Sequence, residues 1–238
     1  MRSRAAPDGY TLLTATAAAA VSQSLFPKIT FDLNRDFTPI GMIASAPLAL
    51  AVHPSLQAKS VQELIAVAKS RPGQLSYATP GTGSSPHLAG EFFKLQAGID
   101  MLHVPYKGMV PAATDVVAGN VPVVLGNTLV VLPHVRNGRL RGLAVTSARR
   151  SNVAPELPTI AESGFPGFES VTWYGMMAPA RAPPEIVTRL NPAVVRALQL
   201  ADVREKLIAL GAEPMPTTPE QMGTFVRDEI ANSRLVTP

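Results

Sequence analysis

The chain has 238 residues, a formal net charge of +4, no cysteine, and 46% hydrophobic but only 5% aromatic residues. This composition is typical of a globular protein and excludes disulfides, thiolate metal sites and a cysteine nucleophile. The basic residues are scattered and few aromatic side chains could stack on bases, so a weakly anionic small ligand is favoured over nucleic acid.

The first third of the chain predicts a strand, a helix and one unusually long apolar stretch. Tyr10–Ala15 is expected to be a strand and Ala17–Phe26 a short helix. A signal peptide is not expected at the start, because Pro7-Asp8-Gly9 and three threonines interrupt the apolar residues. Phe37–His53 is broken by Pro47 and is too long for one ordinary strand, so we expect it to cross between two lobes.

The middle of the chain alternates strands with helices. A capping box, Ser60-Val-Gln-Glu63, opens a helix that is expected to reach Ser70. The expected strands that follow are Leu75–Thr79, Met101–Pro105, Val121–Leu125 and Leu140–Thr146, with helices from Ser85, Val110 and just after Thr128 between them. Short loops between alternating strands and helices predict a parallel sheet with helices on both faces.

Turns rich in Gly, Ser, Thr and Asn follow three of these strands. They are Thr79–Ser85, Tyr106–Gly108 and Gly126–Thr128. In parallel sheets ligands bind beyond the carboxyl ends of the strands, so these turns are the expected site.

The first of these turns, Pro80–Ser84, precedes a helix whose backbone N–H groups would converge on an anion. Ser85 is the expected N-cap and Pro86 the first helical residue; Leu88, Phe92 and Leu95 would form the apolar face, and Gly98 would end the helix. The turn lacks the residues of a dinucleotide fingerprint, a Walker loop or a nucleophile elbow. The alternative is that Thr82, Ser84 and Ser85 only cap the helix.

The last part of the chain returns to the first lobe. Ser151–Ser170 is expected to be a loop around a short helix, Thr159–Ser163, and Val171–Ala178 to be the return strand. Three helices follow, at Pro183–Leu200 with a kink at Pro192, at Asp202–Leu210, and from Thr218 through Ile230. The two crossings predict one lobe of residues 1–53 plus 172–238 and a second of residues 54–171.

The four histidines do not have the spacing of a metal site. His53, His87, His103 and His134 are far apart in sequence and form neither His-x-x-x-His nor His-Glu-x-x-His. No apolar run is long enough for a membrane helix. Neither a metal nor a cofactor is therefore expected.

Six motifs in order carry a resemblance to a known family. They are Pro-Asp-Gly-Tyr-Thr-Leu-Leu (7–13), Lys-Ser-Val-Gln-Glu-Leu (59–64), Gly-Thr-Gly-Ser-Ser-Pro-His-Leu-Ala-Gly-Glu (81–91), His-Val-Pro-Tyr-Lys-Gly (103–108), Leu-Ala-Val-Thr-Ser-Ala-Arg-Arg (143–150) and Leu-Gly-Ala-Glu-Pro (210–214). Together they resemble the Bug-type receptors, the solute-binding proteins of tripartite tricarboxylate transporters. The resemblance implies a two-lobed α/β fold of the type II periplasmic-binding-protein class.

The same resemblance implies a periplasmic receptor that closes its lobes on a small carboxylate, delivers it to a membrane permease and performs no chemistry. The matching ligand positions are Thr79, Gly81, Thr82, Gly83, Ser84, Ser85, His87, Tyr106 and Asn127 in the second lobe, and Thr16 and Ala17 in the first. Gly126 stands where family members usually carry an acid. A small dicarboxylate is the expected ligand.

The chain departs from the family at its start. The signal peptide, first strand and glycine-rich first loop that precede Pro-Asp-Gly-Tyr in the family are absent, so the first lobe is expected to be incomplete. Two alternatives stay open: a truncated remnant or interaction module that binds no ligand, and a serine hydrolase using Ser84 or Ser85 with His87 as base. Turnover of an ester would distinguish the hydrolase.

Overall fold

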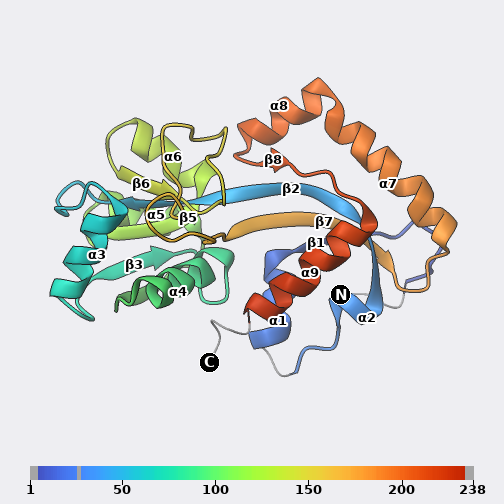
Figure 1. Cartoon of the computed structure of the whole chain (residues 1–238), viewed down its shortest axis with the longest axis horizontal. Coiled ribbons are helices and arrows are strands. Elements are labelled where there is room, and N and C mark those ends of the chain that lie inside the picture. The colour runs from blue at the N-terminus through green and yellow to red at the C-terminus, as the bar shows by residue number, and fades with distance from the viewer. Residues whose placement is uncertain (1–4, 26–27, 234–238) are drawn as a thin grey trace. The chain divides into compact units, whose positions relative to one another are not determined.

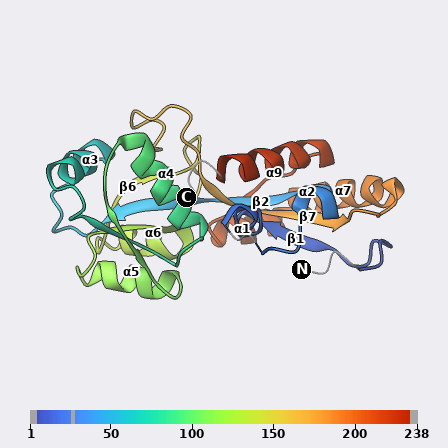
Figure 2. The ribbon, with the colours of Figure 1, turned by 90° about the horizontal axis from the view of Figure 1, so that it is seen from below.

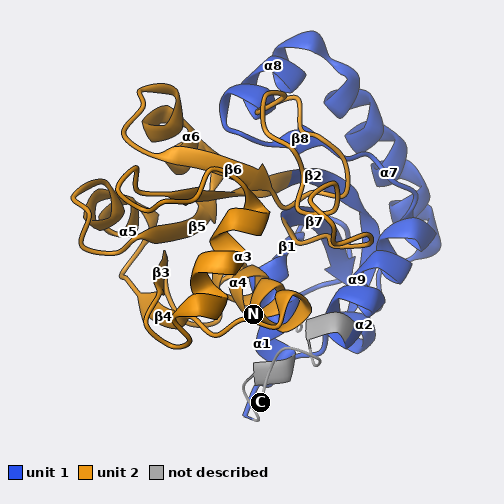
Figure 3. Ribbon diagram, turned by 60° about the vertical axis from the view of Figure 1, so that its left-hand side comes forward, with its two compact units in different colours: residues 1–45, 172–238 blue, residues 46–171 orange. Residues whose placement is uncertain are grey.

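The chain folds as two compact units. The computed structural model describes residues 5–25 and 28–233. Unit 1 comprises residues 1–45 and 172–238, and unit 2 comprises residues 46–171 (Figure 3). The chain leaves unit 1 inside strand β2 (Phe37–Val52), between Ser45 and Ala46 and not at Pro54, and returns at the start of β7 (Val171–Pro179).

The long apolar stretch forms one strand, because β2 runs unbroken for 16 residues. In unit 1 its residues Ala44 and Ser45 pair with Pro214 and Glu213 of β8 (Glu213–Pro214). In unit 2 its pairing with β5 (Val123–Asn127) begins at Leu48. Pro47 lies between these two ladders, where a residue without an N–H group is tolerated.

The sheet of unit 2 is parallel except for β2. Its order is β2, β5, β3 (Ser76–Thr79) and β4 (Leu102–Pro105), and β6 (Arg141–Val145) also pairs with β2. β3 is parallel to both β4 and β5, whereas β2 is antiparallel to β5 and β6. The predicted parallel arrangement is therefore confirmed for β3, β4 and β5, and their carboxyl ends share one edge.

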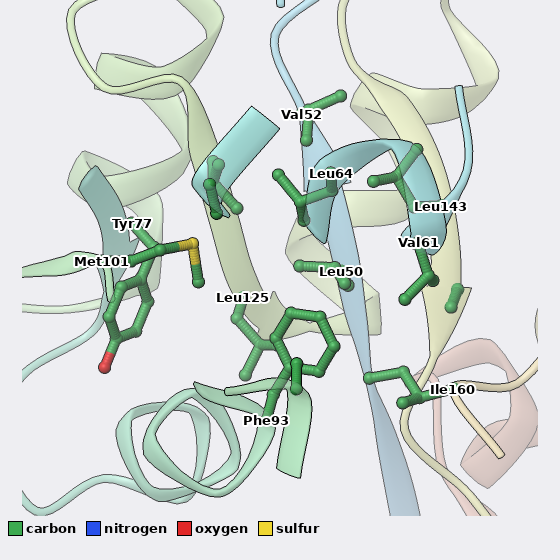
Figure 4. Close-up of a cluster of buried hydrophobic side chains, with 14 of the residues drawn as sticks. Leu50, Val52, Val61, Leu64, Tyr77, Phe93, Met101, Leu125, Leu143 and Ile160 are labelled. Carbon is green, nitrogen blue, oxygen red and sulfur yellow. The ribbon is translucent and has the colours of Figure 1, made fainter. Parts of the chain in front are cut away.

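Helices cover both faces of this sheet, as the alternating pattern predicts. They are α3 (Val61–Ser70), α4 (Ser85–Ala97), α5 (Met109–Val117) and α6 (Thr128–Arg136). Leu48, Leu50 and Val52 of β2 pack with residues of α3 and α4, while Ala49 and Ala51 pack with α5 and α6. Figure 4 shows Leu50 and Val52 beside Leu64 of α3 and Phe93 of α4. Because β2 is buried on both faces, its sequence is a continuous apolar run without alternation.

Unit 1 has its own sheet and core. β7 lies between β1 (Leu13–Thr16) and β2. The helices are α1 (Ala17–Leu25), α2 (Leu33–Asp36), α7 (Pro184–Gln199), α8 (Ala201–Ala209) and α9 (Pro219–Ser233), and α1 and α9 lie side by side in Figures 1 and 2. Trp173 is fully buried in this core and donates from Nε1 to Glu229 at 2.8 Å, which makes it a packing residue.

Several expected details are wrong. The N-cap of α4 is Ser84 and not Ser85, and its buried face carries Ala89 and Phe93, while Leu95 is 64% exposed. Residues 159–163 form a hydrogen-bonded turn that begins with a bridge between Thr159 and Val145. The short elements α2 and β8 are missing from the sequence prediction, because elements of so few residues leave no periodicity to detect.

Two helical glycines provide a matched test of this packing. A Cβ on Gly90 of α4 would lie 2.4 Å from Cε2 of the buried Tyr77 ring, whereas a Cβ on Gly223 of α9 would meet its nearest atoms at 3.5 Å. Gly90→Ala should therefore lower the free energy of unfolding by about 1–3 kcal/mol. Gly223→Ala should raise it by up to about 1 kcal/mol, because alanine is the better helix former. Urea denaturation measures both, and equal shifts in the two variants would contradict the packing.

Candidate functional site

The loop after β3 is held against the turn after β4. The carbonyl of Thr79 accepts from the Tyr106 N–H at 3.0 Å, and the carbonyl of Pro80 accepts from the Gly108 N–H at 3.0 Å. Gly81 has φ of +146°, and a Cβ there would lie 3.2 Å from the Tyr106 carbonyl oxygen. The conformation and the close approach both require glycine at this position.

The two serines of the loop have different roles. The Ser84 hydroxyl donates to the Gly81 carbonyl at 2.6 Å and accepts from the His87 N–H at 3.4 Å, so it is the cap of α4. By contrast, among the described residues the hydroxyls of Thr82 and Ser85 and their N–H groups have no hydrogen-bond partner. These donors lie at the positive end of α4, which is where an anion is stabilised.

Asn127 lies at the same edge of the sheet, at the end of β5, and pairs with Leu48. Its side chain caps no N–H of α6, and within the described part of the chain it has no hydrogen-bond partner. The neighbouring Gly126 is buried, and a Cβ there would lie 2.2 Å from Sδ of Met109. The packing of Met109 thus occupies the space that an acid at position 126 would need.

Tyr106 acts through its backbone and its contact with α5. Its hydroxyl donates to Asp115, which also accepts from Asn120 at 2.7 Å. Burial and this hydrogen bond raise the pKa of Tyr106 to about 12, and the same bond lowers the pKa of Asp115. Because the phenol is already bound to Asp115, Tyr106 serves to fix the turn beside the loop.

A histidine pair that sequence spacing did not reveal lies behind the loop. The rings of His87 and His103 have centroids 4.0 Å apart, and His103 Nε2 is 2.7 Å from Thr79 Oγ1. Burial and the neighbouring His87 lower the pKa of His103 to about 4, against the opposing effect of Glu91. The two histidines are far apart in sequence. His87 lies in the first turn of α4, and His103 lies on β4 opposite Tyr77 of β3.

A buried tyrosine and an ion pair border the histidines. The Tyr77 hydroxyl donates to Glu91 at 2.5 Å, and Lys94 Nζ lies 3.0 Å from both Glu91 oxygens. Burial by itself would raise the pKa of Glu91, but the bonds from Tyr77 and Lys94 outweigh it, and the pKa is lowered. Tyr77 is therefore a packing residue whose hydroxyl is satisfied.

The expected site residues divide between the two units, and those of unit 2 lie at one edge of its sheet. Thr16 and Ala17 lie in unit 1, at the junction of β1 and α1, where Thr16 pairs with Tyr174. A cavity of about 910 Å³ in unit 1 is lined by residues of β2, α7 and α9, and none of the expected site residues lines it.

The described residues show neither a metal-binding cluster nor a membrane-spanning helix. They hold no group of three or more His, Asp or Glu side chains arranged for a metal ion. In the same residues, no helix is both long and apolar enough to cross a membrane.

Comparison with known proteins identifies the family. Residues 1–237 match the family described as the tripartite tricarboxylate transporter family receptor. The chain belongs to this family. It is a family of periplasmic solute-binding receptors and not of enzymes.

Individual relatives agree with this assignment. The chain is 41% identical over 229 residues to the protein BugT of Bordetella pertussis, an alignment covering 95% of this chain and 70% of that protein. A Rhodopseudomonas palustris protein solved with adipate is 37% identical with a TM-score of 0.84, covering 98% of this chain and 79% of that one. MatC from the same organism, solved with bound malate, is 31% identical with a TM-score of 0.80, covering 98% and 81%.

The half-buried His103 makes stability depend on pH. Its pKa is about 4 in the folded protein and near 6.5 when unfolded, so the unfolded chain binds more protons between these values. The free energy of unfolding should fall as the pH drops from about 6.5 to about 4. Urea denaturation across this range measures the slope. His103→Gln should reduce that slope, and an unchanged slope would contradict the assignment.

Proposed function

We propose that this protein is a periplasmic receptor that binds a small dicarboxylate and delivers it to the membrane permease of a tripartite transporter. The loop of residues 79–85 is the feature that carries the proposal. It offers the unpartnered N–H and hydroxyl groups of Thr82 and Ser85 at the start of α4, which suit one carboxylate group. The family supports the role of a receptor, and relatives solved with adipate and malate support the ligand class.

The remaining candidate contacts have separate support. Asn127 supplies an unpartnered amide at the same sheet edge, among the described residues of unit 2. Six other residues shape the loop through the hydrogen bonds and the close approach described above. They are Thr79, Gly81, Gly83, Ser84, His87 and Tyr106. Thr16 and Ala17 rest on the family resemblance alone.

The ligand is proposed to carry no ammonium group. An ammonium needs a carboxylate partner, and position 126 holds Gly126 packed against Met109 in place of an acid. The nearby acids Asp115 and Glu91 already accept hydrogen bonds from Tyr106 and Tyr77. Succinate and aspartate form a matched pair for this point, since they share a carbon skeleton and differ by one ammonium group.

The ligand class is tested by thermal shift with adipate, malate, succinate, aspartate and acetate. A ligand at about a hundred times its dissociation constant adds about 2.7 kcal/mol to the stability of a binder. We expect the dicarboxylates to raise the melting temperature and aspartate to raise it less than succinate. A cooperative melt that no carboxylate moves would support the alternative of a remnant or interaction module that binds no ligand.

The two loop serines give a matched pair of variants. Ser85→Ala should weaken dicarboxylate binding by about 1.5–3 kcal/mol, because a hydrogen bond to a charged group is lost, and should leave the unliganded stability unchanged. Ser84→Ala should lower the unliganded free energy of unfolding by about 1 kcal/mol through loss of the helix cap. Calorimetric titration and urea denaturation separate the two effects. Equal losses of stability in both variants would show that the serines only cap α4.

The hydrolase alternative is not supported by the geometry. The Ser84 hydroxyl donates to the Gly81 carbonyl, and His87 Nδ1 accepts from the Gly83 N–H at 3.2 Å. His87 therefore offers no lone pair to activate either serine, since its other nitrogen carries the proton in the neutral ring.

A further inference from the structure

We propose that His87 and His103 are a positioning pair for the loop of residues 79–85. This loop presents the donors of Thr82 and Ser85 only while both imidazoles are neutral. The part of this proposal that concerns ligand affinity rests on the proposed function. The part that concerns the loop itself does not, because it follows from hydrogen bonds within the protein.

His87 must be neutral for the observed loop to form. Its Nδ1 accepts from the Gly83 N–H at 3.2 Å, and a backbone N–H can only donate. Nδ1 therefore carries a lone pair. Protonation would set a ring N–H against the Gly83 N–H, and this bond would be lost. Gly83 stands between Thr82 and Ser84. Loss of the bond from Gly83 to His87 therefore removes a restraint on the segment that carries the donors of Thr82 and Ser85.

His103 is held neutral by Thr79. The fully buried Thr79 hydroxyl accepts from the Gly81 N–H at 3.3 Å and lies 2.7 Å from His103 Nε2. If His103 donated here, the hydroxyl hydrogen of Thr79 would be buried with no acceptor among the described residues. The arrangement that satisfies the Thr79 hydroxyl has it donating to Nε2, so a neutral His103 anchors Thr79, which in turn anchors Gly81.

Burial disfavours a charge on either ring, and it outweighs the carboxylate of Glu91, which favours the charged form. The rings lie 4.0 Å apart, so one imidazolium would repel a second. Lys94 of α4 adds positive charge, and the carboxylate of Glu91 already accepts from both Lys94 and Tyr77 of β3. Burial lowers the pKa of both histidines, which agrees with the hydrogen-bond geometry.

The alternative role for His87 predicts the opposite pH dependence. An imidazolium that contacted a carboxylate directly would bind it more tightly as the pH falls, because the charged form would be favoured. A positioning pair that must be neutral predicts weaker binding as the pH falls. The sign of the change therefore decides between the two roles.

The first arm of the test needs no ligand. The Gly83 amide and the His87 and His103 ring signals are followed by NMR in the unliganded protein from about pH 7.5 to about pH 4.5. We expect the Gly83 amide to lose hydrogen-exchange protection in step with protonation of His87. A Gly83 amide that stays protected while His87 is protonated would overturn the proposal.

The variants replace a titrating acceptor with one that does not titrate. In His87→Asn the amide oxygen can take the place of Nδ1 and accept from Gly83, and in His103→Gln it can take the place of Nε2. His53→Asn is the matched control, because His53 Nδ1 also accepts a backbone N–H, that of Ser55 at 3.2 Å, but lies at the opposite edge of the sheet, after β2.

The second arm measures adipate affinity by calorimetry over the same pH range. The affinity is expressed for the adipate dianion, because the ligand's own carboxyl groups take up protons at the acid end of the range. In the unmodified protein the affinity should fall about tenfold, which corresponds to a pKa change of about one unit on binding. His87→Asn should flatten the profile relative to its own affinity at high pH, while His53→Asn should leave both the affinity and the profile unchanged. An affinity that rises or stays constant at acid pH would overturn the positioning role. If adipate does not bind at any pH, the proposed ligand class fails, and the Gly83 measurement still decides whether neutral histidines hold the loop.

Discussion

The parallel pairing of β3 with β4 and β5 is the constraint on which the candidate site depends. Parallel strands end at the same edge of a sheet, so the turns that follow Thr79, Pro105 and Asn127 are neighbours although they are far apart in sequence. The hydrogen bonds from Tyr106 and Gly108 to the carbonyls of Thr79 and Pro80 then fix two of these turns to each other. Without this register the loop would have neither its shape nor its histidine support.

The loop separates into groups that build it and groups that are left available. Ser84, Gly81 and the histidines satisfy one another, whereas the donors of Thr82 and Ser85 have no partner within the described residues. Such a division is typical of a binding site, because the protein groups that bind the ligand must be held in position before the ligand arrives. The same reasoning assigns the phenol of Tyr106 to the scaffold, because Asp115 already accepts from it.

A closely packed interior limits what this site can become. A side chain at Gly126 would overlap Met109, and a side chain at Gly90 would overlap the ring of Tyr77. An acid at position 126, where family members usually carry one, would have to displace a buried methionine. The polarity of the Gly126–Thr128 turn is therefore linked to the packing of Met109, and a change of ligand preference at this position requires a change in α5 as well.

The sequence by itself determined the α/β class, most strands and helices of unit 2, and the family. Periodicity, caps and motif order can be read from the sequence without knowledge of the fold, because each depends on residues that are close together or in a fixed order. The choice of Ser84 over Ser85 as the cap, the burial of Phe93 in place of Leu95, and the meeting of His87 with His103 were decided only by the tertiary structure. These features depend on which strand lies beside which and on which helix face meets the sheet, because such contacts join residues that no sequence spacing connects.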